Sequence, residues 1–86
     1  MRIALVQLTS SRSVEDNIGL VRARLAEAGR RHADVVVFPE ATMRAFGHSL
    51  TEVAEPLDGP WADAVRAAAD DAGVVAVVGM FTPGEP

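Results

Sequence analysis

The sequence predicts an α/β protein with a parallel sheet, because three unbroken apolar runs are separated by two segments with helical spacing. The apolar runs span residues 3–8, 33–38 and 74–81. Runs of this length that do not alternate with polar residues are typical of strands buried on both faces, as in parallel sheets. The second and third runs are rich in valine, which favours strand over helix because β-branched side chains lose freedom in a helix.

The segment between the first two runs has the pattern of a helix with one buried face. Its apolar residues recur three or four positions apart, and they are Val14, Ile18, Val21, Leu25 and Ala28. Ser13 is suited to cap the start of this helix, with Asp16 forming a variant of the capping box. Gly29 is a poor helix former, so we expect the last turn to fray.

A second helix is predicted just before the third run. Pro60 suits the first helical position, with Gly59 or Asp58 as its cap. Gly73 suits the left-handed residue that ends a helix. Trp61 leads the apolar stripe of this helix, and we expect it to anchor the core and not to stack on a ligand.

The predicted order is strand, helix, strand, long connection, helix, strand, which implies right-handed crossovers. Residues 41–57 form the long connection, and a connection of that length in a compact domain is typical of a functional or disordered loop. Two helices cannot cover both faces of a three-stranded sheet. We therefore expect residues 1–86 to form one partial domain, the opening part of a larger one.

Composition argues against several functions. The net charge is −4 and all eight basic residues are arginine, so no basic face for nucleic acid is expected. The chain has no cysteine and no lysine, which excludes a thiolate zinc site, a cysteine nucleophile and a P-loop lysine within it. We expect no metal site, because His32 and His48 lack ligand partners at suitable spacing, and we expect no cofactor.

The first apolar run is too short for a signal peptide or a membrane span. The sequence therefore predicts a cytoplasmic protein that does not contact membranes.

Glu40 is the strongest candidate for a reactive group. It follows the second apolar run, directly after Pro39, and reactive groups of open α/β folds gather where parallel strands end. A carboxylate that follows a buried strand there would be partly desolvated. Partial desolvation raises the pKa of a carboxylate, which makes it a usable general base. The alternative is an ordinary surface carboxylate beside a proline.

The residues around Glu40 resemble the first active-site block of the nitrilase, or carbon–nitrogen hydrolase, superfamily. That block spans residues 36–42, with the sequence VVFPEAT. Three further stretches resemble the family in the same order: residues 2–8 its first strand, 54–60 the approach to its second helix, and 78–81 the strand that follows. Asn17 stands where the first helix of the family commonly carries an asparagine. The run that begins at Glu40 is most similar to the amidase branches close to ω-amidase and deaminated-glutathione amidase.

The resemblance implies a four-layer α-β-β-α sandwich, of which residues 1–86 are the N-terminal part, in a protein that is commonly a homodimer. It implies hydrolysis of a non-peptide amide or nitrile through a Glu-Lys-Cys triad, with Glu40 as the glutamate. The lysine and cysteine match nothing in this chain. We expect them in polypeptide beyond residue 86, and we expect the 86 residues alone to be inactive.

Four of the residues that follow Glu40 are candidates to line the mouth of a substrate pocket: Thr42, Met43, Arg44 and Phe46. Arg44 and Phe46 are the two candidate substrate-binding residues. The guanidinium of Arg44 could bind a substrate carboxylate through two hydrogen bonds. The alternative is a solvated charge on a loop.

Two other interpretations stay open. The lack of cysteine and lysine also fits a hydrolase-derived domain that has lost catalysis and binds a partner or a small molecule. A nucleotide-binding module is suggested only by the order of strands and helices, and the chain has no GxGxxG motif.

Overall fold

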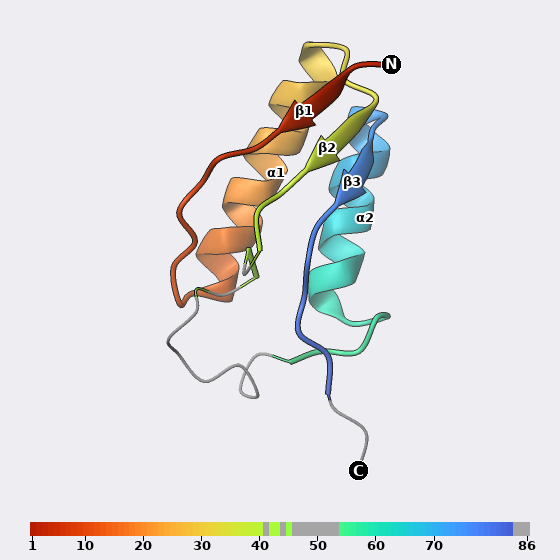
Figure 1. Ribbon diagram of the computed structural model, residues 1–86. Helices are drawn as coiled ribbons and strands as arrows, with labels where there is room; N and C mark the ends of the chain where they lie inside the picture. Colours follow the sequence, from red (N-terminus) through yellow and green to blue (C-terminus); the bar gives the residue numbers. More distant parts are fainter. Residues whose placement is uncertain (41, 44, 46–53, 84–86) are drawn as a thin grey trace.

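The computed structural model describes residues 1–40, 42, 43, 45 and 54–83, and it confirms the α/β class (Figure 1). The elements, in chain order, are β1 (Ile3–Leu5), α1 (Val14–Arg30), β2 (Val35–Val37), α2 (Pro60–Ala72) and β3 (Val75–Val77). The strands lie in the order β1-β2-β3, and both neighbouring pairs are parallel. Each strand lies where an apolar run predicts it, but each is shorter than that run.

Both helices lie on the same face of the sheet (Figure 1). Each helix joins one strand to the next strand in the same direction across the sheet. Right-handed crossovers then place both helices on one side. The two helices also pack against each other, and α2 packs against β3. The described part of the chain is therefore a sheet with one helical layer.

The two faces of the sheet have different surroundings. On the helical side, Val36 is fully buried, and Ala4 and Ala76 pack against the core. On the other side, the exposed fractions reach 52–76% at Ile3, Leu5, Val75 and Val77. The sequence predicts strands buried on both faces. The structure buries one face only, because both described helices lie on the same side.

The core lies between the sheet and the helices. Its buried hydrophobic side chains form one cluster, made of Val21, Leu25, Ala28, Ala33, Val36, Phe38, Met43 and Trp61. The predicted role of Trp61 as an anchor is confirmed, since only 3% of this residue is exposed. Among the described residues, neither helix has the length and apolar character needed to cross a bilayer.

Helix α1 begins as predicted and ends differently. The Ser13 Oγ accepts a hydrogen bond from the N–H of Asp16 (3.2 Å). The N–H of Ser13 donates to the Oγ of Ser11 (3.1 Å) and not to Asp16, so the predicted capping-box variant is only half formed. At the far end, the helix continues through Gly29 to Arg30, and the expected fraying is wrong.

Gly29 is explained by the neighbouring helix. A Cβ at this position would lie 2.7 Å from the carbonyl oxygen of Ala72, at the end of α2. Glycine therefore lets the two helices approach closely. This packing offsets the poor helix propensity of glycine, which is about 1 kcal/mol relative to alanine.

Helix α2 has the predicted end residues and an additional cap. Gly59 precedes the helix, Pro60 begins it, and Gly73 ends it in the left-handed conformation (φ 70°). The side-chain cap comes from Glu55, whose Oε1 accepts a hydrogen bond from the N–H of Trp61 (2.6 Å). A Cβ at Gly59 would lie 3.2 Å from this Oε1, so the glycine makes room for the carboxylate.

Candidate active site

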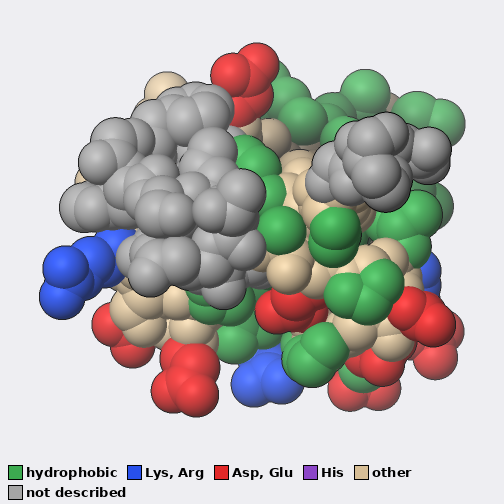
Figure 2. Space-filling view, turned by 90° about the horizontal axis from the view of Figure 1, so that it is seen from below, with side chains coloured by type: hydrophobic (Ala, Val, Ile, Leu, Met, Phe, Trp, Pro, Cys, Tyr) green, Lys and Arg blue, Asp and Glu red, His purple; other side chains and the backbone are tan. Residues whose placement is uncertain are grey.

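Glu40 lies three residues past the end of β2, at the edge of the sheet where the parallel strands finish. Figure 2 views the molecule from this end, where hydrophobic side chains lie near the centre and along the upper right edge, with acidic side chains among and around them. Glu40 itself is exposed, whereas the sequence predicts partial desolvation. The described residues place a helical layer on one face of the sheet only, and they leave this carboxylate open to solvent.

The backbone on both sides of Glu40 is anchored in the core. Before it, Phe38 is buried, and its N–H donates to the carbonyl oxygen of Val77 (3.0 Å). After it, Thr42 is fully buried, and its Oγ1 donates to the carbonyl oxygen of Pro39 (2.5 Å). Glu40 therefore lies on a short turn whose two flanks are fixed.

Asn17 is a buried polar residue on α1 that contacts the segment after Glu40. The residue is fully buried. Its Nδ2 donates to the carbonyl oxygens of Met43 (2.9 Å) and Ser11 (2.7 Å). Its Oδ1 accepts from the N–H of Ser11 (2.9 Å). Buried amides need such partners because an unpaired one costs about 1–3 kcal/mol, and here both ends of the amide are satisfied.

Met43 links this segment to the residues that follow β3. The residue is fully buried, and its Sδ accepts from the N–H of Phe81 (3.4 Å). The carbonyl oxygen of Phe81 accepts from the N–H of Glu55 (2.9 Å). The chain after Glu40 is therefore bonded to α1 through Asn17 and to the segment that follows β3 through Phe81.

The sequence-predicted site residues differ in how the structure places them. Glu40 lies at the expected edge of the sheet. Thr42 and Met43, expected at the mouth of a pocket, are instead fully buried and support the turn from inside. Arg44 and Phe46 lie outside the described residues, as does His48.

Sequence reasoning missed the structural roles of Asn17 and Glu55. The signal for Asn17 is present in the sequence: it lies three residues after Val14 and four before Val21, so a polar residue interrupts an apolar helical face. The signal for Glu55 is weaker, because a carboxylate six residues before Trp61 is not a standard cap position.

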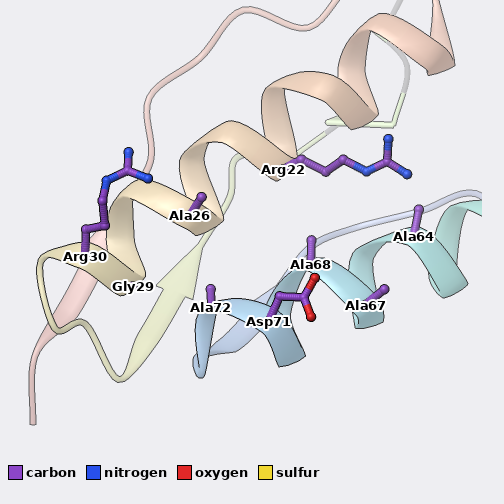
Figure 3. A pocket seen from close by; sticks show the side chains of 9 residues that line it. All are labelled: Arg22, Ala26, Gly29, Arg30, Ala64, Ala67, Ala68, Asp71 and Ala72. Atoms are coloured by element: carbon purple, nitrogen blue, oxygen red, sulfur yellow. The ribbon is translucent and has the colours of Figure 1, made fainter.

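The groove between α1 and α2 lies apart from this turn, and the described residues form no metal-binding cluster at it. The described residues contain no group of three or more histidine, cysteine, aspartate and glutamate side chains that could hold a metal ion. A groove of about 600 Å³ lies between α1 and α2, and most of its lining residues are alanines. Figure 3 shows Arg22 and Asp71 projecting into this groove from opposite helices. None of its lining residues belongs to the turn that carries Glu40.

Comparison with known proteins agrees with the pattern around Glu40. The family model for carbon-nitrogen hydrolases matches residues 2–85. The chain belongs to the carbon–nitrogen hydrolase family. Among its relatives are two proteins from strains of Mycobacterium tuberculosis, Hydrolase Rv0480c and Hydrolase MT0498, each 51% identical over 83 residues. These matches cover 96% of this chain and 30% of each relative, so the chain spans less than a third of their length.

The described residues present the carboxylate of Glu40 on an anchored turn, and the chain contains no cysteine and no lysine. A carboxylate can take and return protons, but it needs a nucleophile to activate. Within this chain, Glu40 has no thiol to deprotonate.

Proposed function

We propose that this chain supplies the proton-transferring carboxylate, Glu40, of a carbon–nitrogen hydrolase that cleaves non-peptide amides or nitriles. In this proposal, the lysine and cysteine of a Glu-Lys-Cys triad come from polypeptide outside residues 1–86. The observation that carries the proposal is the position of Glu40 on an anchored turn at the carboxyl end of β2, in a chain of this family.

The reaction proceeds in two steps. The cysteine sulfur attacks the carbonyl carbon of the amide, and the C–N bond breaks as a thioester forms. Glu40 takes the thiol proton and delivers it to the leaving ammonia or amine. It then deprotonates the water that hydrolyses the thioester and returns this proton to the thiol. The lysine charge stabilises the oxyanion of each tetrahedral intermediate, an effect worth about 3–4 kcal/mol in comparable sites.

The open face of the sheet supports a four-layer α-β-β-α arrangement for the complete domain. This face carries exposed apolar side chains at Ile3, Leu5, Val75 and Val77. Burial of apolar surface contributes about 25 cal/mol per Å², so a second sheet stacked about 10 Å away would be stabilised by covering them. In this proposal, the added layers also close over the edge that carries Glu40 and provide the missing desolvation.

The proposed substrates are small amides, in line with the resemblance of the run that begins at Glu40 to the amidase branches of the family. The first test is ammonia release by the complete protein, with ω-amides of short dicarboxylic acids and simple nitriles compared side by side. We expect turnover of the amides, and we expect none from the 86 residues alone. Turnover by the 86 residues alone would contradict the proposal that the lysine and cysteine of the triad lie outside them.

The second test removes the carboxylate. We expect Glu40→Gln to lower kcat of the complete protein by about 10²–10⁴-fold, the usual contribution of a general acid–base group. The matched control is Glu27→Gln, which removes a half-exposed carboxylate of α1 that is paired with Arg31 (3.3 Å), and it should leave kcat unchanged. If Glu40→Gln retains full activity, Glu40 is not the general base. A complete protein without turnover, and without a lysine and cysteine, would instead be a binding domain derived from a hydrolase.

A further inference from the structure

We propose that Asn17 is a positioning residue that holds Glu40 in place through the backbone of Met43. This inference rests on the proposed role of Glu40 as the general base. Asn17 is fully buried on α1 and donates a hydrogen bond to the carbonyl oxygen of Met43 (2.9 Å), three residues after Glu40 in the chain.

The two flanks of the Glu40 turn are held by different parts of the fold. The flank before Glu40 belongs to the sheet, through the hydrogen bond from Phe38 to Val77. The flank after Glu40 is held to α1 by the side-chain amide of Asn17. The position of the carboxylate thus depends on the distance between the sheet and α1, and Asn17 sets that distance at the turn.

An asparagine suits this position for a chemical reason. Its Nδ2 donates to two carbonyl oxygens, those of Ser11 and Met43, while its Oδ1 accepts from the N–H of Ser11. An aspartate would offer no donor to either carbonyl oxygen. The carbonyl oxygen of Ser11 also accepts from the N–H of Ala45 (2.9 Å). The same cluster therefore fixes the chain at two points after Glu40.

A small displacement at this turn has a large kinetic effect. A misplacement of about 1 Å in a catalytic group can lower the rate by about 10²-fold. Asn17 is buried and makes its described hydrogen bonds within the protein, so its loss should act on the position of Glu40 more than on substrate binding. We therefore expect a fall in kcat with little change in KM.

The test compares variants of the complete hydrolase with ammonia release as the assay. Asn17→Ala removes all the side-chain hydrogen bonds, and Asn17→Gln keeps an amide but displaces it by one methylene. We expect each to lower kcat at least about 10-fold, with KM changed less than about twofold. Asn17→Gln is the milder change and decides the result if the alanine variant does not fold.

The matched control is Ser13→Ala, at the start of the same helix. It removes the hydrogen bond from the N–H of Asp16 to the Ser13 Oγ (3.2 Å) but leaves the contact between Asn17 and Met43 intact. We expect its kcat to stay within about twofold of wild type, since a lost helix cap affects stability and not the Glu40 turn.

Glu40→Gln, assayed in parallel, separates the two proposals. If Glu40→Gln is inactive and both Asn17 variants behave like Ser13→Ala, the positioning role is wrong and the proposed function stands. If Glu40→Gln retains full activity, the proposed function fails, and the positioning role fails with it. If Glu40→Gln is inactive and both Asn17 variants lose kcat while Ser13→Ala does not, the positioning role is supported.

Amide hydrogen exchange adds a readout that does not depend on turnover. In Asn17→Gln we expect faster exchange at the N–H of Ala45, because its acceptor on Ser11 loses the cluster that fixes it. The N–H of Val74, bonded to Ala69 (3.1 Å) at the far end of α2, should exchange as in wild type. Unchanged protection at Ala45 would contradict the proposal.

Discussion

The two faces of the sheet are built from the same kinds of side chain and have opposite surroundings. Val36 faces the helices and is fully buried, while Val75 and Val77, one strand away, are 62% and 52% exposed. Valine is therefore no guide to burial at a single position in this sheet. The alternation of the strand decides which face a residue occupies, and the helices decide which face is covered.

The difference between the faces indicates what the strand sequences are adapted to. Sheets with one face in water usually alternate apolar and polar residues, whereas these strands are apolar throughout. Such strands are stable with both faces covered. The second face therefore fits a further layer, as the four-layer proposal requires.

The largest expected difference is between two leucines. Leu25 of α1 is fully buried against the covered face, and Leu5 on the open face is 76% exposed. In the 86-residue chain, we expect Leu25→Ala to lower the free energy of unfolding by about 2–5 kcal/mol. Leu5→Ala should change it by less than about 1 kcal/mol, since little buried surface is lost. Urea denaturation measures both values, and equal losses would contradict the one-layer arrangement.

Replacing valine with threonine on each face of the sheet compares the two faces with little change in side-chain shape. Threonine keeps the β-branch of valine but adds a hydroxyl. Val36→Thr would bury this group among apolar side chains, so we expect a loss of about 1–3 kcal/mol. Val77→Thr leaves the hydroxyl at a position that is half exposed, where its effect on unfolding of the 86-residue chain should be near zero. Similar losses at both positions would mean that the second face is also buried.

Two glycines of α1 test the helical layer itself. Gly29 faces Ala72, where an added Cβ would lie 2.7 Å from a carbonyl oxygen, while Gly19 has no heavy atom within 4 Å of such a Cβ. We expect Gly29→Ala to destabilise the chain by about 1–3 kcal/mol through overpacking. Gly19→Ala should stabilise it by up to about 1 kcal/mol, because alanine is the better helix former. Thermal unfolding should show shifts of opposite sign, and shifts of the same sign would contradict the close contact.

The smallest expected effect tests the four-layer proposal in the complete protein. There, the second sheet would cover Val77, and Val77→Thr should lower stability by about 1 kcal/mol or more. The control is Val36→Thr, which should be equally costly in the complete protein and in the 86-residue chain. If Val77→Thr remains neutral in the complete protein, this face is not covered by a second layer.

Much of the fold could be predicted from local patterns. The apolar runs locate the strands, and Ser13, Pro60 and Gly73 mark helix ends where the structure has them, because capping depends on a few neighbouring residues. The expected fraying at Gly29 was wrong because the end of this helix depends on a long-range contact and not on neighbouring residues. The contact that stabilises this turn comes from Ala72, far away in the sequence.

In the candidate site, too, the sequence locates one residue but not the residues that support it. Glu40 could be located because a charged residue two positions after an apolar run is visible in the sequence and parallel strands end at a common edge. Its supports could not be located from spacing alone. The hydrogen bond between Asn17 and Met43 joins residues 26 positions apart, and the one between Phe81 and Met43 joins residues 38 positions apart.

The α/β class, the order of the elements and the position of the acidic residue after the second strand follow from the amino-acid sequence, because periodicity and capping are properties of short segments. Which face of the sheet the helices cover, and which buried amide bonds to the segment after Glu40, could be learned from the folded chain alone. Both depend on contacts between segments distant in the chain, and the direction of each crossover brings those segments together.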